Sequence, residues 1–302
     1  RAVPTGLDHG TVTIVADGRG FEVTTLRKDI KTDGRHAQVE FTDDWGADAA
    51  RRDFTLNALY ANFAGDVFDP CGQGLADARE GRIRFVGDPT ARIAEDYLRI
   101  LRFFRFYAHY GRGEMDPVGL AACAAARAGL QSLSAERVTQ EVTKLLSAED
   151  PRAAIKKINE NNVLDFVFDP TAAVPLDRLM AAEIKVGEVD ALLRLLVAAG
   201  GDIQKIVSCL RLSNKEIKYL NDVSNVKLEA KSDLFALRRD AARYGIPAVL
   251  AAVKKDVAMK NINLPNGYEQ IRGWTVPVCP VGGEDFLAVG LSCPAVGLAL
   301  AA

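Results

Sequence analysis

The chain contains 302 residues, and 38 lysines and arginines against 40 aspartates and glutamates give it a formal net charge of −2. Hydrophobic residues make up 48% of the sequence and charged residues 26%, which are ordinary values for globular proteins and exclude a disordered, collagen-like or coiled-coil chain. No run of about 18 uninterrupted apolar residues occurs, so we expect no membrane span. The length exceeds that of a typical single domain and predicts several modules.

The cysteine and histidine content argues against a disulfide framework and against a zinc site. The five cysteines lie far apart with no C-x-x-C pair, which is typical of reduced thiols and predicts a cytoplasmic protein in which all five are structural. His9, His36 and His109 have no second histidine or cysteine at ligand spacing, so we expect no metal site built from these residue types. The cysteines are Cys71, Cys123, Cys209, Cys279 and Cys293.

The N-terminal part is predicted to form strands. Two runs rich in β-branched residues, 11–15 and 21–26, are separated by the turn-forming residues 17–20, which is a hairpin pattern. Glu22 lies in the second run, where alternation places it on the face opposite its two neighbours. A lone glutamate in a strand is usually solvated, so Glu22 by itself indicates no chemistry.

The residues after this hairpin are predicted to be irregular and then helical. The polar segment from 27 to 48 has little apolar periodicity, which predicts a long mobile loop of the kind that is often functional in a compact domain. A short helix is expected over 51–60. The turn-rich residues 69–72 then mark a shift in composition toward helix.

Signals for helix starts recur in the rest of the chain. Asp88-Pro89 and Asp150-Pro151 each predict an N-cap followed by proline at the first helical position, and the first of these helices is expected to run to about Tyr110. Ser134 predicts another start. Residues 213–216 have the S-x-x-E form of a capping box.

The segment from 79 to 112 holds the most informative charge pattern. It contains eight arginines and no lysine, which suits phosphate and base contacts better than simple solvation. On a helix, Asp96 and Arg99 share one face and Glu95 can brace Arg99, so a carboxylate and a guanidinium could hydrogen-bond the edge of a base. Alternatively, Arg92 with Asp96 and Glu95 with Arg99 form ordinary ion pairs four residues apart, worth only tenths of a kcal/mol.

A second charged cluster precedes it. Arg51 and Arg52 suit a triphosphate, while Asp53 and Asn57, four residues apart, could hold a ribose hydroxyl. Taken alone, the same residues also fit a charged helix start.

Four sequence motifs follow one another between residues 51 and 103, and their order and spacing match those of a known family. They are R-R-D-F-T-x-N-A at 51–58, D-P-x-G at 69–72, I-R-F-V-G-D-P at 83–89 and R-I-x-E-D-x-L-R-x-L-R-F at 92–103. Together they resemble the bacterial tRNA nucleotidyltransferase (CCA-adding) and poly(A) polymerase family. Segments 4–12 and 21–27 are similar to the head domain of that family, and 134–141 to its later neck motif. The similarity is dense from residue 3 to about 147, generic across the later helices and faint at Gly283-x-Asp285.

The resemblance implies roles for individual residues. Asp96 and Arg99 would select the base without a nucleic-acid template, with Glu95 in support. Arg52 would face the triphosphate, Asp53 and Asn57 the ribose, and Arg102 would join this nucleotide-binding set. Residues 28–48 would correspond to a flexible loop tied to the switch from C to A addition.

The resemblance also implies a metal site, which this sequence matches only in part. The family's carboxylates bind two Mg²⁺ that align a tRNA 3′-hydroxyl with the α-phosphate of CTP or ATP. Glu22 matches the third carboxylate as a catalytic metal ligand, but the G-G-x-V-R-D turn and the D-x-D pair, expected before Thr5, do not occur in the 302 residues. We therefore expect sequence to be missing before Arg1, and we expect the chain as written to be inactive alone.

The expected fold class is α+β: a small, truncated β-rich nucleotidyltransferase head followed by a mostly helical neck, body and tail. The expected boundaries are 1–62 for the head, 63–148 for the nucleotide-selecting neck, 149–262 for the body and 263–302 for a partial, tRNA-binding tail. The expected function is CCA addition to tRNA, with no DNA or membrane partner. Poly(A) polymerase, an A-only relative and a non-catalytic RNA-binding protein on the same scaffold remain the alternatives.

Overall fold

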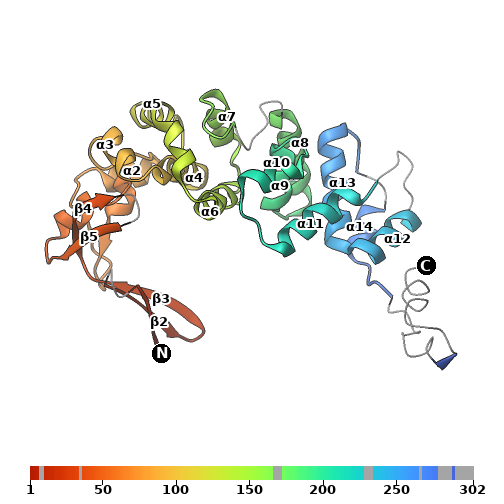
Figure 1. The fold of residues 1–302 in the computed structure, drawn as a ribbon, viewed down its shortest axis with the longest axis horizontal. Coiled ribbons are helices and arrows are strands. Elements are labelled where there is room, and N and C mark those ends of the chain that lie inside the picture. Colours follow the sequence, from red (N-terminus) through yellow and green to blue (C-terminus); the bar gives the residue numbers. More distant parts are fainter. Residues whose placement is uncertain are drawn as a thin grey trace.

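The computed structural model describes residues 1–6, 10–33, 36–165, 172–227, 234–264, 267–277 and 288–289. The strands lie at one end of an elongated molecule and the helices follow in chain order toward the other (Figure 1). The α+β class is therefore confirmed. His9, Cys279, Cys293 and the Gly283-x-Asp285 similarity lie outside the described residues, as does most of the predicted tail.

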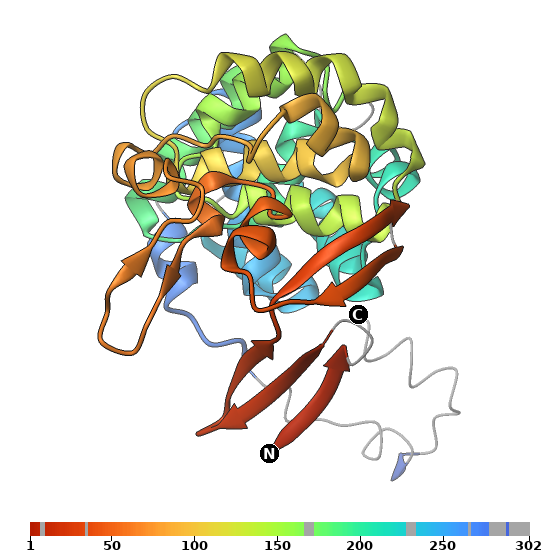
Figure 2. The same ribbon diagram turned by 90° about the vertical axis from the view of Figure 1, so that its left-hand side faces the viewer.

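The first sheet is the predicted hairpin with one added strand. β1 (Ala2–Gly6), β2 (Thr11–Ala16) and β3 (Arg19–Thr24) are antiparallel in the order β1-β2-β3. Glu22 of β3 stands opposite Thr13 of β2 and is exposed. Figures 1 and 2 show this sheet projecting away from the helices.

A second hairpin occupies the segment that we expected to be a loop. β4 (Arg27–Asp33) and β5 (His36–Phe41) pair in antiparallel fashion, and α1 (Trp45–Ala50) follows them. The prediction of a long loop over 27–48 is therefore wrong. It relied on missing apolar periodicity, whereas this hairpin is a two-stranded ladder of backbone hydrogen bonds with a charged cross-strand pair, Lys28 and Glu40, 2.9 Å apart.

The segment predicted as a helix over 51–60 is also different. α1 ends before it, and only Thr55–Ala58 is helical, as one 3₁₀ turn. The reason is that Phe54 is extended and forms a β-bridge with Phe85, so the preceding residues cannot continue a helix. Short elements follow: β6 (Tyr60–Ala61), β7 (Val67–Phe68) and α2 (Gly74–Glu80).

The single helix expected from Pro89 to Tyr110 is two helices. α3 (Pro89–Glu95) and α4 (Leu98–Tyr110) are separated by Asp96, whose φ of −156° and ψ of 108° are extended. Asp88 caps α3 as predicted, accepting from the backbone N–H groups of Thr90 and Ala91.

The remaining helix starts follow the sequence signals closely. Ser134 is the N-cap of α6, and Ser213 and Glu216 form the predicted capping box of α11. The helix after Asp150-Pro151 begins at Arg152, one residue later than expected. The later elements are α5 (Pro117–Ala126), a 3₁₀ turn (Arg127–Ser132), α6 (Ala135–Leu146), α7 (Arg152–Glu160), α8 (Ala173–Val186), α9 (Ala191–Ala198), α10 (Ile203–Cys209), α11 (Asn214–Asn225), α12 (Leu234–Tyr244), α13 (Ile246–Lys260) and α14 (Tyr268–Arg272).

One hydrophobic core joins the helical part from Phe54 to Ile271. Within it, Arg194 of α9 is buried with only 1% of its surface exposed. Its Nε donates to Glu183 of α8 at 2.6 Å, and its Nη1 donates to the carbonyls of Leu146 and Ala148 at 2.9 and 2.6 Å. Arg194 therefore satisfies the open carbonyl end of α6 and ties α6 to the next helices.

We predict that Arg194→Ala lowers the free energy of unfolding by about 3–5 kcal/mol, because it leaves the buried Glu183 carboxylate without its cationic partner. Arg152→Ala is the matched control: its pair with Asp150 is about half exposed, so the loss should be roughly 0–1 kcal/mol. Urea denaturation monitored by circular dichroism measures both. Equal losses in the two variants would contradict this account of Arg194.

Candidate functional site

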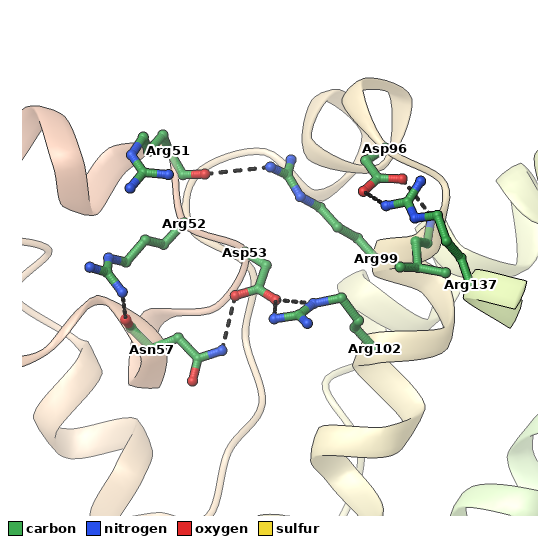
Figure 3. Close-up of a pocket in the computed structure, with 9 residues that line it drawn as sticks. Arg51, Arg52, Asp53, Asn57, Asp96, Arg99, Arg102 and Arg137 are labelled. Atoms are coloured by element: carbon green, nitrogen blue, oxygen red, sulfur yellow. Dashed lines mark hydrogen bonds and ion pairs between the residues drawn. The ribbon is translucent and has the colours of Figure 1, made fainter. Parts of the chain in front are cut away.

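A cavity of about 400 Å³ lies where the segment after α1 meets the starts of α4 and α6. Five arginines, two aspartates, an asparagine and a leucine line it (Figure 3): Arg51, Arg52, Asp53, Asn57, Asp96, Leu98, Arg99, Arg102 and Arg137. Its volume is within the range of small-molecule sites, and its walls carry an excess of positive charge.

The wall formed by residues 51–57 is held in place from behind. Phe54 is completely buried, and its ring packs on those of Phe85 and Phe103 at centroid distances of 5.0 and 6.3 Å. The N–H of Val86 donates to the carbonyl of Asp53 at 3.0 Å. Because neighbouring side chains of an extended segment point to opposite faces, burying Phe54 turns Asp53 toward the cavity.

Asp53 joins this wall to α4. One carboxylate oxygen accepts from Nδ2 of Asn57 at 2.9 Å, and the other accepts from Nε of Arg102 at 2.6 Å. Asp53 and Asn57, which the sequence assigned together to a ribose hydroxyl, thus lie within hydrogen-bond distance of each other, although they are not on a regular α-helix.

Two further arginines form hydrogen bonds with backbone carbonyls of the same wall. Arg92 of α3 donates from Nη2 to the carbonyls of Arg51 and Arg52, and Arg99 of α4 donates to the carbonyl of Arg51 at 3.4 Å. Glu95 accepts from both Arg92 and Arg99. Glu95 is not part of the cavity lining, and it reaches the cavity only through its ion pairs with Arg92 and Arg99.

Asp96 lies at the break between α3 and α4. One of its oxygens accepts from the N–H of Leu98 at 3.1 Å, and the other accepts from Nη2 of Arg137 in α6 at 2.7 Å. Asp96 and Arg99 therefore reach one cavity from the two sides of a helix break. The sequence prediction placed them on a single helical face, which is wrong.

The cavity gathers most of the predicted nucleotide-binding residues and adds two. Arg51, Arg52, Asp53, Asn57, Asp96, Arg99 and Arg102 line it, as the sequence led us to expect of one nucleotide site. Leu98 and Arg137 were not among the predicted site residues. The sequence signal for Arg137 was its place in the neck motif at 134–141, but that motif did not indicate contact with Asp96, 41 positions away.

Behind the arginines, the buried carboxylate of Asp48 in α1 was also missed. Its side chain is 1% exposed, and it accepts hydrogen bonds from Arg51, Arg52, Tyr60 and the backbone N–H of Arg27. Burial alone would raise the pKa of Asp48, but the hydrogen bonds from Tyr60, Arg51 and Arg27 lower it to about 2. Burial and the bond to Asp48 raise the pKa of Tyr60 to about 12.

Glu22 does not belong to this cavity. It lies in the exposed first sheet, and it is absent from the cavity lining. In the described ranges, no group of three or more His, Cys, Asp or Glu side chains is arranged to hold a metal ion. Because Mg²⁺ requires a near-octahedral shell of oxygens, Glu22 alone does not fit a Mg²⁺ site.

A larger cavity of about 670 Å³ lies nearby, between α1 and the β6–β7 pair. Its lining includes Trp45, Tyr60, Val67 and Phe68, and it contains no cationic side chain. An anionic ligand would gain no charge pairing there, so the arginine-lined cavity is the better candidate for a phosphate-bearing molecule.

Comparisons with known proteins show the family to which the chain belongs. Residues 1–84 match the family described as "Poly A polymerase head domain", and residues 114–174 match the "Probable RNA and SrmB- binding site of polymerase A". CCA tRNA nucleotidyltransferase 1, mitochondrial, of Homo sapiens is 33% identical over 297 residues, covering 95% of this chain and 68% of that protein. The chain belongs to the CCA tRNA nucleotidyltransferase and poly(A) polymerase family. It is thus a member of a family of nucleotidyltransferase enzymes.

Two further relatives extend the comparison. The CCA-adding enzyme of Lacticaseibacillus paracasei is 37% identical over 175 residues, covering 57% of this chain and 43% of that protein. The crystal structure of the Bacillus stearothermophilus CCA-adding enzyme in complex with CTP has a TM-score of 0.67 at 23% identity, covering 99% of this chain and 77% of that one. At this identity the likeness supports the fold.

Two of the remaining sequence expectations concern membranes and thiols. None of the helices in the described ranges is both long and apolar enough to span a bilayer. Among the cysteines that the structure describes, Cys71, Cys123 and Cys209 are free thiols.

The low pKa of Asp48 predicts how stability depends on pH. A carboxylate whose pKa falls from about 3.9 in the unfolded chain contributes stability fully above that value and loses it as pH falls through the folded-state pKa of about 2. The difference in unfolding free energy between wild type and Asp48→Asn should therefore be constant from pH 5 to 8 and shrink below pH 4. Asp43→Asn, at an exposed position, is the control and should differ little from wild type at any pH. A wild-type advantage over Asp48→Asn that persists unchanged to pH 2 would contradict the assignment.

Proposed function

We propose that the protein adds C and A nucleotides to the 3′ end of tRNA from CTP and ATP without a nucleic-acid template, the base being selected by Asp96 and Arg99. The observation that carries this proposal is that a carboxylate and a guanidinium able to contact a base lie in the same cavity as two arginines suited to a triphosphate. The proposed domain plan places these residues at the junction of a head (1–62) and a neck (63–148).

The donor and acceptor pattern of Asp96 and Arg99 matches cytosine and adenine. Both bases present an amino donor beside a ring-nitrogen acceptor, so the amino group can donate to the carboxylate while the guanidinium donates to the ring nitrogen. Uracil and guanine present a carbonyl where cytosine and adenine present the amino group, and they would place an acceptor against Asp96. Arg137 and the Leu98 N–H occupy two of roughly four acceptor positions of the carboxylate, which leaves acceptor capacity for the base.

The opposite wall supplies the other contacts. Arg51 and Arg52 would bind the triphosphate, since guanidinium groups form charge-assisted hydrogen bonds with phosphate oxygens. Asp53 and Asn57 would face the ribose, with Arg102 holding the Asp53 carboxylate in position. Glu95 would act indirectly, through Arg99.

We also propose Mg²⁺ as the cofactor of the whole enzyme, with Glu22 as one of its ligands. The described residues do not complete a Mg²⁺ shell, so we derive no step of the reaction through the metal. What this chain supplies is nucleotide binding and base choice.

The test is extension of an end-labelled tRNA lacking its terminal CCA, using the protein as its gene encodes it, with Mg²⁺ and CTP, ATP or both. Stepwise growth by C, C and A is the expected result. A single added A would indicate an A-only relative, and a long A ladder would indicate a poly(A) polymerase. RNA binding without any extension would indicate a non-catalytic RNA-binding protein.

In the same assay, we predict that Asp96→Ala reduces the preference for CTP and ATP over UTP and GTP by roughly 10–100-fold, because about 1–3 kcal/mol of base discrimination is lost. Asp96→Asn keeps an oxygen that can accept from Leu98 and should lose preference in the same direction. The affinity for tRNA should change little. Asp177→Asn, exposed on α8, is the control. Unchanged base preference in both Asp96 variants, or a fall in tRNA affinity instead, would mean that Asp96 has a structural role.

A further inference from the structure

We propose that Asp48 is a positioning residue that holds Arg51 and Arg52 in the orientation required for the triphosphate of the bound nucleotide. The inference rests on the proposed function, and it concerns a residue that lies behind the cavity and does not line it. Asp48 would act only through the two arginines.

The carboxylate of Asp48 is divided between the two guanidinium groups. Its Oδ1 accepts from Nε of Arg51 at 2.8 Å, and its Oδ2 accepts from Nη2 of Arg52 at 3.0 Å. Each arginine is thus fixed by its own oxygen, and the exposed fractions of their side chains, 17% and 32%, leave part of each available to the cavity. An asparagine at this position would offer one acceptor oxygen where the aspartate offers two.

Charge is the second reason for a carboxylate here. Arg51 and Arg52 are consecutive in the chain and line one wall, so their positive charges repel each other in the absence of an anion. Asp48 is nearly completely buried beside them, where a charge interacts more strongly than at the surface. It would thereby keep both arginines in place before the nucleotide binds, which lowers the cost of ordering them on binding.

Tyr60 forms hydrogen bonds with both Asp48 and Arg52. Its hydroxyl donates to Oδ2 of Asp48 at 2.6 Å and accepts from Nε of Arg52 at 3.2 Å, and the guanidinium lies 5.0 Å from the centre of its ring. Because Tyr60 stays protonated at neutral pH, this hydroxyl remains a donor to Asp48.

The backbone of Arg27 forms hydrogen bonds with both Asp48 and Arg51. The Arg27 N–H donates to Oδ1 of Asp48 at 3.2 Å, and the Arg27 carbonyl accepts from Nε of Arg51 at 3.0 Å. Arg27 is the first residue of β4, so the base of the β4–β5 hairpin and the arginine wall share one buried carboxylate.

The test is a titration of the purified chain with CTP, ATP, UTP, GTP and CMP, comparing wild type with Asp48→Asn. We expect Asp48→Asn to weaken CTP and ATP binding by about tenfold, as for the loss of a charge-assisted contact, and to weaken CMP, which lacks the β- and γ-phosphates, by less than about threefold. The ratio of CTP to UTP affinity should be unchanged, because Asp96 and Arg99 are intact. A purely structural role would weaken CTP and CMP alike.

Asp43→Asn is the matched control, because it makes the same chemical change at an exposed position near α1. Tyr60→Phe is the second variant if Asp48→Asn does not fold: it keeps the charge of Asp48, removes one bond to it, and should weaken CTP by a few-fold while leaving CMP and the CTP-to-UTP ratio unchanged. If the wild type binds CTP and Asp48→Asn binds it equally tightly, the role of Asp48 is overturned while the proposed function stands. The same holds for Tyr60→Phe where that variant replaces Asp48→Asn. Absence of CTP binding in wild type would overturn the proposed function and this role together.

Discussion

Arginine side chains of the helical part hold the backbone and one carboxylate of the strand-rich part, and the candidate site exists because of these contacts. Arg92 donates to the carbonyls of Arg51 and Arg52, while Arg102 pairs with Asp53. Behind them, Phe54 is buried against aromatic rings of the helical core. The two walls of the cavity are therefore fixed relative to each other by polar bonds at the front and by apolar packing at the rear.

The same site presents an electrostatic problem, since five arginines converge on one cavity. Ion pairs with carboxylates offset the repulsion between these arginines. Asp48 pairs with Arg51 and Arg52, and Glu95 pairs with Arg99. Each carboxylate orients a guanidinium as well as offsetting its charge, because the bonds are directional. Positive charge remains in excess at the cavity wall, which is the condition that an anionic ligand requires.

Local signals in the sequence predicted several helix starts correctly, but not the helix expected over 51–60 or the break within 89–110. Asp88 and Ser213 were correct as caps because a cap depends on hydrogen bonds within one turn. The β4–β5 hairpin was missed because its strands carry no apolar alternation. The break at Asp96 was missed because the contact that Asp96 makes with Arg137 of α6 cannot be inferred from helical spacing. The motifs identified most of the cavity lining, whereas Asp48 became recognisable only through tertiary contacts.

The central claim is that the arginine-lined cavity is the nucleotide site, and a crystal structure of the chain with CTP tests it most directly. We predict electron density for the base against Asp96 and Arg99 and for the triphosphate against Arg51 and Arg52. CTP bound elsewhere, for example in the apolar cavity beside Trp45, or CTP bound in the reverse orientation with its phosphates at Asp96, would contradict the account.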